Sequence, residues 1–335
     1  MNEYKLAYKK IKRANNIIVL PHKNADGDAL GCAYAMKCIL EEMGKRARVV
    51  CEETEEHKLM CVVCRGAELR SAETAADFEA DLVISVDCAD LGRLGERVGI
   101  FEQAGDGTIC FDHHKSCTNF ANINCVVPDS GACGEVLYEF CKANKIKINT
   151  DIANNLYLAI SSDTGGFRQS NASPETLEIA ADLMRLGANS GKINTALFLS
   201  NTISHTRLVG DVLRDLRFDE EHGISVIKSR QEQLKKYNCT QDDSEGLVNF
   251  ARNIIGVNVG IFLREKDDGG IKGSLRSNYD EYDVSEICAN FGGGGHLRAA
   301  GCDFNDCTIE EAEEKLFAET ARYIDERDER DSSCK

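Results

Sequence analysis

Four clusters of acidic and histidine residues recur along the first half of the chain, each at or near the end of an apolar run. The clusters are His22-x3-Asp26-x-Asp28, Asp87, Asp112-His113-His114 and Asp163. Carboxylates and imidazoles that come from the ends of successive elements are the ligands that a two-metal hydrolytic site needs. Together the clusters therefore predict a site for two divalent cations.

Most of these clusters also have a structural explanation when each is taken alone. Asp26 or Asp28 would cap a following helix, and Asp87 would do the same before the next turn. Asp163 stands in a Gly-rich stretch and would be a turn former. Consecutive imidazoles at a strand end have no such packing explanation, and the three potential ligands within the seven residues 22–28 favour a metal. The metal interpretation rests on the clusters jointly.

Short apolar segments that alternate with helical patterns would position these clusters. Strands are predicted at 16–20, 46–51, 81–87 and 108–111, and helices at 29–43, 130–144, 150–161 and 174–187. Strands that alternate with helices favour an α/β fold with a doubly wound, mainly parallel sheet. Such sheets bind ligands outside the carboxyl ends of their strands. We therefore expect the first three clusters to meet in one crevice.

A second, smaller α/β domain with a mixed sheet is predicted in the last third of the chain. Its strands are predicted at 224–227, 257–264 and 271–276, with a hairpin turn at 266–270 and helices at 284–290 and 308–327. The expected organisation is a metal-binding catalytic domain at 1–190, a helical connector at 191–216, a substrate-binding domain at 217–327 and a frayed tail at 328–335. The active site is expected in the cleft between the two domains.

Composition points to a cytoplasmic protein. No segment of the 335 residues approaches the ~20 apolar residues that span a bilayer, and the N-terminus lacks the apolar core of a signal peptide. Many of the 16 cysteines lie in apolar segments, among them Cys38, Cys51, Cys110 and Cys141. These are interpreted as small core residues in a reducing compartment. Cys61-x2-Cys64 is the only closely spaced pair, and incidental thiols are favoured there over a structural metal.

The charge balance bears on the substrate. A formal net charge of −16 opposes stable binding of long nucleic acid, because that binding depends on neutralising phosphates. An anionic substrate would be short and would need locally concentrated cations. No membrane partner is expected, and a homodimer is compatible with the sequence.

The clusters also resemble a known family when they are read as motifs. The four segments HKNADGDALG from His22, VD ending at Asp87, FDHH ending at His114 and SDTG around Asp163 resemble the motifs of the DHH phosphoesterases. GGGGH ending at His296, with AAG at 299–301, resembles the glycine-rich signature of the C-terminal domain in one branch. Order and spacing match over about residues 10–325. Within the family the chain most resembles the nano-RNase/pAp phosphatases, which degrade very short RNA and 3′-phosphoadenosine 5′-phosphate (pAp).

The resemblance implies a role for each residue of the four motifs. One cation would be held by His22, Asp26 and Asp87, and a second by Asp28, Asp87, His113 and Asp163. His114 would face the substrate phosphate, while Asp112 would orient an imidazole. Mixed histidine and carboxylate ligation suits Mn²⁺, with Mg²⁺ or Co²⁺ also compatible. A hydroxide shared by the two cations would then be the nucleophile.

Substrate-binding residues are expected mainly in the second domain. The backbone N–H groups of Gly293, Gly294 and Gly295 would cradle a phosphate, although a flexible loop is the alternative. The resemblance implies nucleotide contacts for Arg276, Ser277 and His296. In the first domain Arg168 would bind substrate, and Phe167 would either stack on a base or pack in the core. Lys115 and Arg298 are interpreted as solvated surface charges.

The expected function is hydrolysis of very short oligoribonucleotides to mononucleotides, of pAp to AMP, or of both. A cyclic-di-AMP or pApA phosphodiesterase shares all of these motifs and stays open as an alternative. A RecJ-type exonuclease is disfavoured by the acidic balance, and a family II pyrophosphatase by the GGGGH segment. A non-catalytic nucleotide-sensing module would have lost a ligand such as Asp87 or His113, and both are present.

Overall fold

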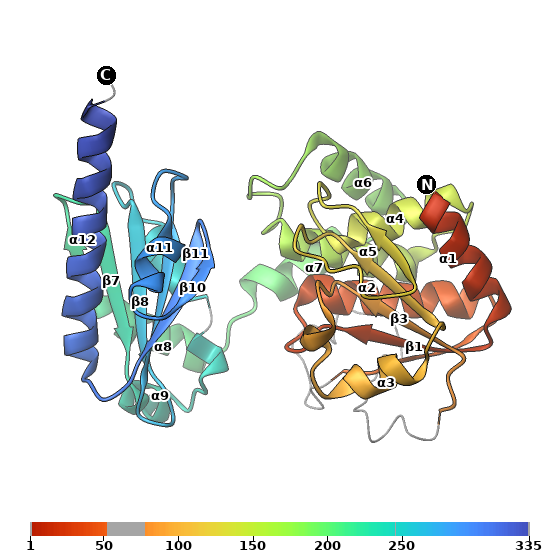
Figure 1. Ribbon diagram of the computed structural model, residues 1–335, viewed down its shortest axis with the longest axis horizontal. Helices are drawn as coiled ribbons and strands as arrows, with labels where there is room; N and C mark the ends of the chain where they lie inside the picture. Colours follow the sequence, from red (N-terminus) through yellow and green to blue (C-terminus); the bar gives the residue numbers. More distant parts are fainter. Residues whose placement is uncertain (1, 52–77, 245, 334–335) are drawn as a thin grey trace. The chain divides into compact units, whose positions relative to one another are not determined.

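The computed structural model describes residues 2–51, 78–244 and 246–333, and the chain divides into two compact units, Met1–Ser200 and Asn201–Lys335 (Figure 1). Each unit is built around its own sheet. The boundary divides the predicted connector, because α7 (Ser190–Asn194) and η4 (Thr195–Leu199) belong to the first unit and α8 (Ile203–Arg214) to the second. The predicted connector at 191–216 is helical and spans the boundary between the two units. The Cys61/Cys64 pair lies outside the described residues.

The first unit contains a five-stranded sheet in which every strand pair is parallel. The strand order is β2-β1-β3-β4-β5, formed by β1 (Asn16–Pro21), β2 (Arg46–Val49), β3 (Leu82–Val86), β4 (Thr108–Asp112) and β5 (Ile123–Val126). Alternate residues of β1 enter different cores, since Ile17 and Val19 pack on one face and Ile18 and Leu20 on the other. This confirms the predicted doubly wound parallel sheet. Strand β5 was not predicted.

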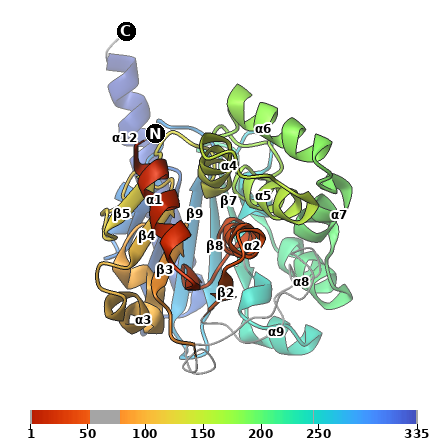
Figure 2. The same cartoon turned by 90° about the vertical axis from the view of Figure 1, so that its right-hand side faces the viewer.

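Helices cover both faces of this sheet (Figure 2). One face carries α1 (Asn2–Arg13), α2 (Gly27–Glu42) and α4 (Cys133–Ala143), with α5 (Thr150–Asp163) against α2 and α4 and α6 (Pro174–Arg185) against α5. The other face carries the short η3 (Leu91–Arg97) and α3 (Val98–Gln103). Helix α1 was missed because only Ala7 and Ile11 are fully buried in a lysine-rich segment.

The second unit contains a six-stranded sheet, which confirms the predicted mixed sheet and adds three strands to those predicted. Its order is β10-β11-β9-β8-β7-β6, formed by β6 (Arg217–Asp219), β7 (Ile224–Ser229), β8 (Val259–Glu265), β9 (Ile271–Ser277), β10 (Gly294–His296) and β11 (Ala299–Phe304). The β7–β8 pair is parallel and the other pairs are antiparallel. The sheet order places β9 between β8 and β11.

Two layers of helices enclose the second sheet. One face packs against α8, α9 (Gln231–Tyr237) and α10 (Val248–Arg252), and the other against α11 (Val284–Ala289) and α12 (Ile309–Ser333). A short turn, η5 (Asp242–Ser244), precedes α10. Helix α12 continues beyond Arg327 to Ser333, so the prediction of a frayed tail from 328 is wrong up to that residue.

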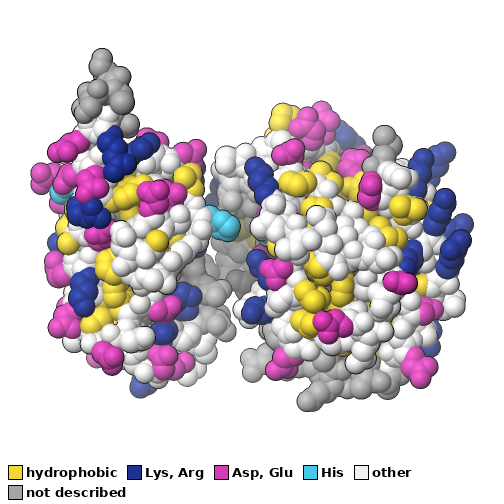
Figure 3. All heavy atoms as spheres, viewed as in Figure 1, with side chains coloured by type: hydrophobic (Ala, Val, Ile, Leu, Met, Phe, Trp, Pro, Cys, Tyr) yellow, Lys and Arg dark blue, Asp and Glu magenta, His cyan; other side chains and the backbone are white. Residues whose placement is uncertain are grey.

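Burial and surface charge follow the composition. Cys38, Cys51, Cys110 and Cys141 are buried free thiols, which confirms their interpretation as small core residues. Acidic and basic side chains are mixed over the visible face of each unit (Figure 3). Among the described residues, no helix combines the length and apolar character that a membrane crossing needs.

Candidate metal centre

The candidate site lies where the strand order of the first sheet reverses. Strands β1 and β3 are neighbours, and the chain leaves them in different directions to β2 and β4, which makes this edge the switch point of the sheet. His22 follows β1, Asp87 follows β3 and Asp112 ends β4. The first three clusters therefore meet at the carboxyl edge, as the sequence predicted. Asp163 joins them from the last residue of α5.

Two glycines let α2 approach α5 closely enough for this. A Cβ added at Gly27 would lie 2.3 Å from Oγ of Ser162, and one at Gly31 would lie 2.6 Å from the carbonyl oxygen of Asn155. Side chains at these positions would force the helices apart. The close crossing brings Asp28 on α2 towards Asp163 on α5.

The first group of ligands is His22, Asp26 and Asp87. Nε2 of His22 lies 3.6 Å from Oδ2 of Asp87 and 3.8 Å from Oδ1 of Asp26. Nδ1 of His22 lies 2.6 Å from the carbonyl oxygen of Lys23, which only accepts, so Nδ1 donates and Nε2 faces the carboxylates. Asp26 also caps α2, because its Oδ1 accepts from the backbone N–H groups of Asp28 and Ala29. The capping interpretation of Asp26 is therefore confirmed, and its place in this group keeps it a candidate metal ligand.

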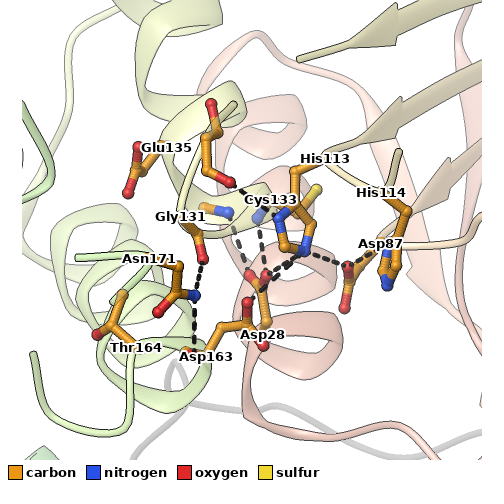
Figure 4. Close-up of polar contacts among 12 residues, drawn as sticks. Asp28, Asp87, His113, His114, Gly131, Cys133, Glu135, Asp163, Thr164 and Asn171 are labelled. Carbon is orange, nitrogen blue, oxygen red and sulfur yellow. Dashed lines mark hydrogen bonds and ion pairs between the residues drawn. The ribbon is translucent and has the colours of Figure 1, made fainter. Parts of the chain in front are cut away.

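The second group is formed around His113 (Figure 4). Its Nε2 lies 3.6 Å from Oδ1 of Asp87, 3.7 Å from Oδ2 of Asp163 and 3.8 Å from Oδ2 of Asp28. Nδ1 of His113 donates to the carbonyl oxygen of Ser130, 3.1 Å away, which leaves Nε2 for the carboxylates. Asp87 thus turns Oδ2 towards the first group and Oδ1 towards the second.

The start of α4 fixes Asp28. Its Oδ2 accepts from the backbone N–H of Cys133 at 2.7 Å, and its Oδ1 from that of Gly134 at 3.1 Å. The positive end of the helix dipole favours a carboxylate there. A Cβ at Gly134 would lie 2.8 Å from Cβ of Ala159 on α5, so α4 also packs closely. This support was not predicted, because backbone donors leave no sequence motif; the glycine at the helix start was the only signal.

His114 and Asp112 form a pair that adjoins the second group, because Nδ1 of His114 also lies 3.7 Å from Oδ1 of Asp87. Nδ1 of His114 lies 2.8 Å from Oδ1 of the fully buried Asp112. Burial alone would raise the pKa of Asp112, but the hydrogen bond and charge of His114 outweigh it and lower that pKa. The structure therefore gives Asp112 the predicted contact with an imidazole, and that imidazole is His114. Nε2 of His114 is left for another partner.

The electrostatics of the site favour a bound cation. Burial, followed by the neighbouring Asp163 carboxylate, raises the pKa of Asp28 to about 7, and burial also raises the pKa of Asp87 well above its usual range. Oδ1 of Asp87 is buried without a hydrogen-bond donor, and Asp87 has a left-handed φ of 53°. Strain and unsatisfied buried oxygens cluster at functional sites. The donor set and the orphaned oxygen together fit divalent cations.

Two of the predicted substrate residues in the second unit have their polar groups used locally. The N–H groups of Gly292 and Gly293 donate to the carbonyls of Ala289 and Cys288 at the end of α11, and a Cβ at Gly293 would lie 2.2 Å from the carbonyl oxygen of Gly301. Gly293 thus serves the fold, and its amide is not free to cradle a phosphate as predicted. The buried hydroxyl of Ser277 exchanges hydrogen bonds with the backbone of Tyr279.

The remaining predicted residues present more accessible groups. Arg276 is half-buried on β9, and Gly294, Gly295 and His296 are exposed on β10. In the first unit, Nε of the exposed Arg168 donates to the carbonyl of Gly165, and its guanidinium lies over the ring of Phe198. Phe167 packs edge-on against Tyr157 at the margin of the core, which supports the packing alternative.

Comparison with known proteins supports this organisation. The model of the DHH family N-terminal domain matches residues 16–160, and that of the DHHA1 domain matches residues 224–326. The bifunctional oligoribonuclease and PAP phosphatase NrnA of Thermus thermophilus is 27% identical over 90% of this chain and 88% of its own. The cyclic-di-AMP phosphodiesterase GdpP of Geobacillus thermodenitrificans is 24% identical over 91% of this chain and 47% of its own.

A solved structure extends the similarity to the whole fold. An exopolyphosphatase-related protein from Bacteroides fragilis superposes with a TM-score of 0.88 and 26% sequence identity, covering 98% of both chains. The two matched domains follow one another in the order expected from the motifs. This chain therefore combines an N-terminal domain of the DHH family with a DHHA1 domain.

Proposed function

We propose that this protein is a cytoplasmic, metal-dependent phosphoesterase that hydrolyses very short oligoribonucleotides to mononucleotides and pAp to AMP. One observation carries the proposal: Asp87 turns one carboxylate oxygen to each of two ligand groups, and its Oδ1 has no donor. This is the arrangement of a carboxylate shared by two cations. The name of the Thermus thermophilus relative supports the choice of substrates.

Two groups of residues would each hold one metal ion. His22, Asp26 and Asp87 would hold one cation, and Asp28, His113, Asp163 and Asp87 the other. When bound, two such cations supply Lewis-acid chemistry, because they lower the pKa of water and neutralise charge on phosphoryl oxygens. We propose Mn²⁺, since each group combines carboxylate oxygens with one imidazole. Asp28 keeps its geometry through the N–H groups of α4.

His114 would act directly on the substrate. Asp112 accepts from Nδ1 of His114 and so fixes the ring, which leaves Nε2 for the substrate. When protonated, Nε2 would donate a proton to a phosphoryl oxygen or to the leaving oxygen. Asp112 would be a positioning residue, since it reaches the substrate only through the imidazole.

A cyclic-di-AMP or pApA phosphodiesterase is the second candidate. The GdpP relative supports it, because its match covers most of this chain and includes both units. The chain spans about half of that relative, which carries further segments. The same metal groups would serve either class of substrate, so the two candidate functions are distinguished only by measuring turnover of each substrate.

A substrate panel tests the proposal. Metal-replete protein would be assayed with Mn²⁺ on RNAs of two to five nucleotides, pAp, pApA, cyclic-di-AMP, pyrophosphate and long single-stranded DNA. We expect turnover of the short RNAs and pAp that is abolished in His113→Ala. His205→Ala is the matched control, because His205 bonds the carbonyl of Asp243 in the other unit. Turnover of none of these substrates would leave a nucleotide-sensing module as the better account, and preference for cyclic-di-AMP would select the second candidate.

A further inference from the structure

Three arginines that are distant in the sequence meet at one end of the second sheet. Arg276 on β9 pairs with Gly260 on β8 and with Ala299 on β11. Arg298 immediately precedes Ala299, and its carbonyl accepts from the N–H of Ser277. Arg252 is the last residue of α10, and a Cβ added at Gly260 would lie 2.5 Å from its backbone nitrogen. Arg252 and Arg298 therefore flank Arg276.

The cross-strand register extends this arrangement to His296. His296 on β10 pairs with Ala299, which in turn pairs with Arg276. Residues directly opposite one another in neighbouring strands point to the same face of a sheet. Gly260, Arg276, Ala299 and His296 thus form one row on one face, with the smallest residues on either side of Arg276. The Gly260 position on this face lies directly under Arg252.

The backbone of Arg252 is held without the help of its guanidinium group. Nδ2 of Asn278 donates to the carbonyl oxygens of Arg252 and Val257, at 2.8 Å each. On the other side, the backbone of Arg252 fits over Gly260 only because that residue has no side chain. The side chain itself is restrained by one neutral contact, from Nε to Oδ1 of Asn253. This leaves the remaining guanidinium donors for a ligand.

The three arginines differ in how their charges are balanced. Arg298 forms an ion pair with Asp280. In the part of the chain that the structure describes, neither Arg252 nor Arg276 pairs with a carboxylate, and both are half-buried. Burial, and next the charge of Arg298, lower the pKa of Arg252; burial, and next the charge of Arg252, lower that of Arg276. The chain has 56 acidic and 40 basic residues, yet within the described ranges Arg252 and Arg276 have no carboxylate partner.

We infer that Arg252 joins Arg276 in binding a terminal phosphate monoester, so that substrates ending in a phosphate are preferred to those ending in a free hydroxyl. A terminal phosphate carries about two negative charges near neutral pH, whereas an internal phosphodiester carries one. Two guanidinium forks match the oxygens and the charge of such a dianion. The inference rests on the proposed function and adds Arg252 as a specificity-determining residue.

The test compares pApA with ApA, which differ only in the 5′-phosphate. We expect the full-length, Mn²⁺-loaded protein to prefer pApA, and Arg252→Gln to reduce the ratio of kcat/KM values by about 10- to 100-fold, through KM. Arg252→Lys should recover part of the ratio, since lysine keeps the positive charge but lacks the planar guanidinium that binds two phosphate oxygens at once. Arg322→Gln is the matched control, because it removes an arginine of the same unit that pairs with Glu319 and Glu326. An unchanged ratio in Arg252→Gln would overturn the inference.

A binding measurement separates this inference from the proposed function. Calorimetric titration of the full-length, metal-free protein with 5′-AMP and with adenosine needs no turnover. We expect tighter binding of 5′-AMP, and loss of that difference in Arg252→Gln but not in Arg322→Gln. If the protein cleaves no RNA, the proposed function fails and the titration still decides the role of Arg252. If RNA is cleaved and both variants behave like the original protein, only the role of Arg252 is refuted.

Discussion

The two units carry opposite electrostatic imbalances. In the first unit, the carboxylates of Asp28, Asp87 and Asp163 are crowded at the edge of a parallel sheet, and burial raises their pKa values. In the second, Arg252 and Arg276 lie side by side without carboxylate partners among the described residues, and burial lowers their pKa values. Each arrangement costs free energy until a ligand of opposite charge binds. The difference indicates metal ions for one unit and a phosphate for the other.

Asp87→Asn should have the largest effect, because it removes the shared carboxylate. We expect kcat to fall by about 10³-fold or more, on the scale of losing a major electrostatic contribution to catalysis. Binding of 5′-AMP to the metal-free protein should stay unchanged, since that site is assigned to the other unit. Asp151→Asn, on the exposed first turn of α5, is the control. Near-normal turnover by Asp87→Asn would contradict the assignment of the metal ions to the first unit.

Arg276→Gln should show the reverse pattern. Loss of a charge-assisted contact with phosphate should reduce kcat/KM on pApA by about 10- to 100-fold. The change should lie mainly in KM, with the Mn²⁺ content per chain unaltered. Steady-state kinetics and metal analysis of the same preparation check both parts. A variant that loses metal with its activity would show that the two sites are not separable.

Gly31→Ala should reach the metal centre through packing. The added methyl group would lie 2.6 Å from the carbonyl oxygen of Asn155, and overpacking of this kind costs about 1–3 kcal/mol of unfolding free energy. Activity should fall as well, because the added methyl group would displace α2 and so move Asp28 away from Asp163. Gly99→Ala in α3 meets no atom within 4 Å and should have a neutral or slightly stabilising effect. Denaturant unfolding of both variants measures the difference.

The smallest expected effect is a pH dependence of the stabilisation by Mn²⁺. Because the folded-state pKa of Asp28 is raised from 3.8 to about 7, the metal-free folded chain binds more protons than the unfolded chain within that window. Its stability should therefore fall as pH rises towards 7. Mn²⁺ requires the ionised carboxylate, so its stabilising shift in Tm should grow between pH 5.5 and 7.5. A shift that is largest at pH 5.5 would contradict this assignment.

The positions of the acidic cluster could be predicted from the sequence because each candidate ligand follows an apolar run within a few residues. His22, Asp87 and Asp112 could be placed at strand ends from periodicity alone, and the parallel sheet brings such ends together. The support given to Asp28 by backbone N–H groups of α4 was not predictable, since every residue has a backbone donor. Only the three-dimensional structure shows that the N–H groups of Cys133 and Gly134 donate to this carboxylate.

The cluster of Arg252, Arg276 and His296 in the second unit was only partly predicted, for a different reason. Arg276 and His296 were recognised through motifs, but Arg252 stands in no motif and becomes their neighbour only through the packing of α10 on Gly260. The glycine run was misinterpreted at Gly293, whose amide caps α11 and whose missing side chain admits β11. Local pattern could not distinguish a phosphate cradle from a helix cap followed by a tight strand pair.

Crystals of the protein soaked in Mn²⁺ would test the central claim most directly, through an anomalous-difference map. The account predicts two ions per chain, one bound by His22 and the other by His113, with Asp87 in contact with both. A map without peaks at these residues, or with a single ion that does not touch Asp87, would contradict it.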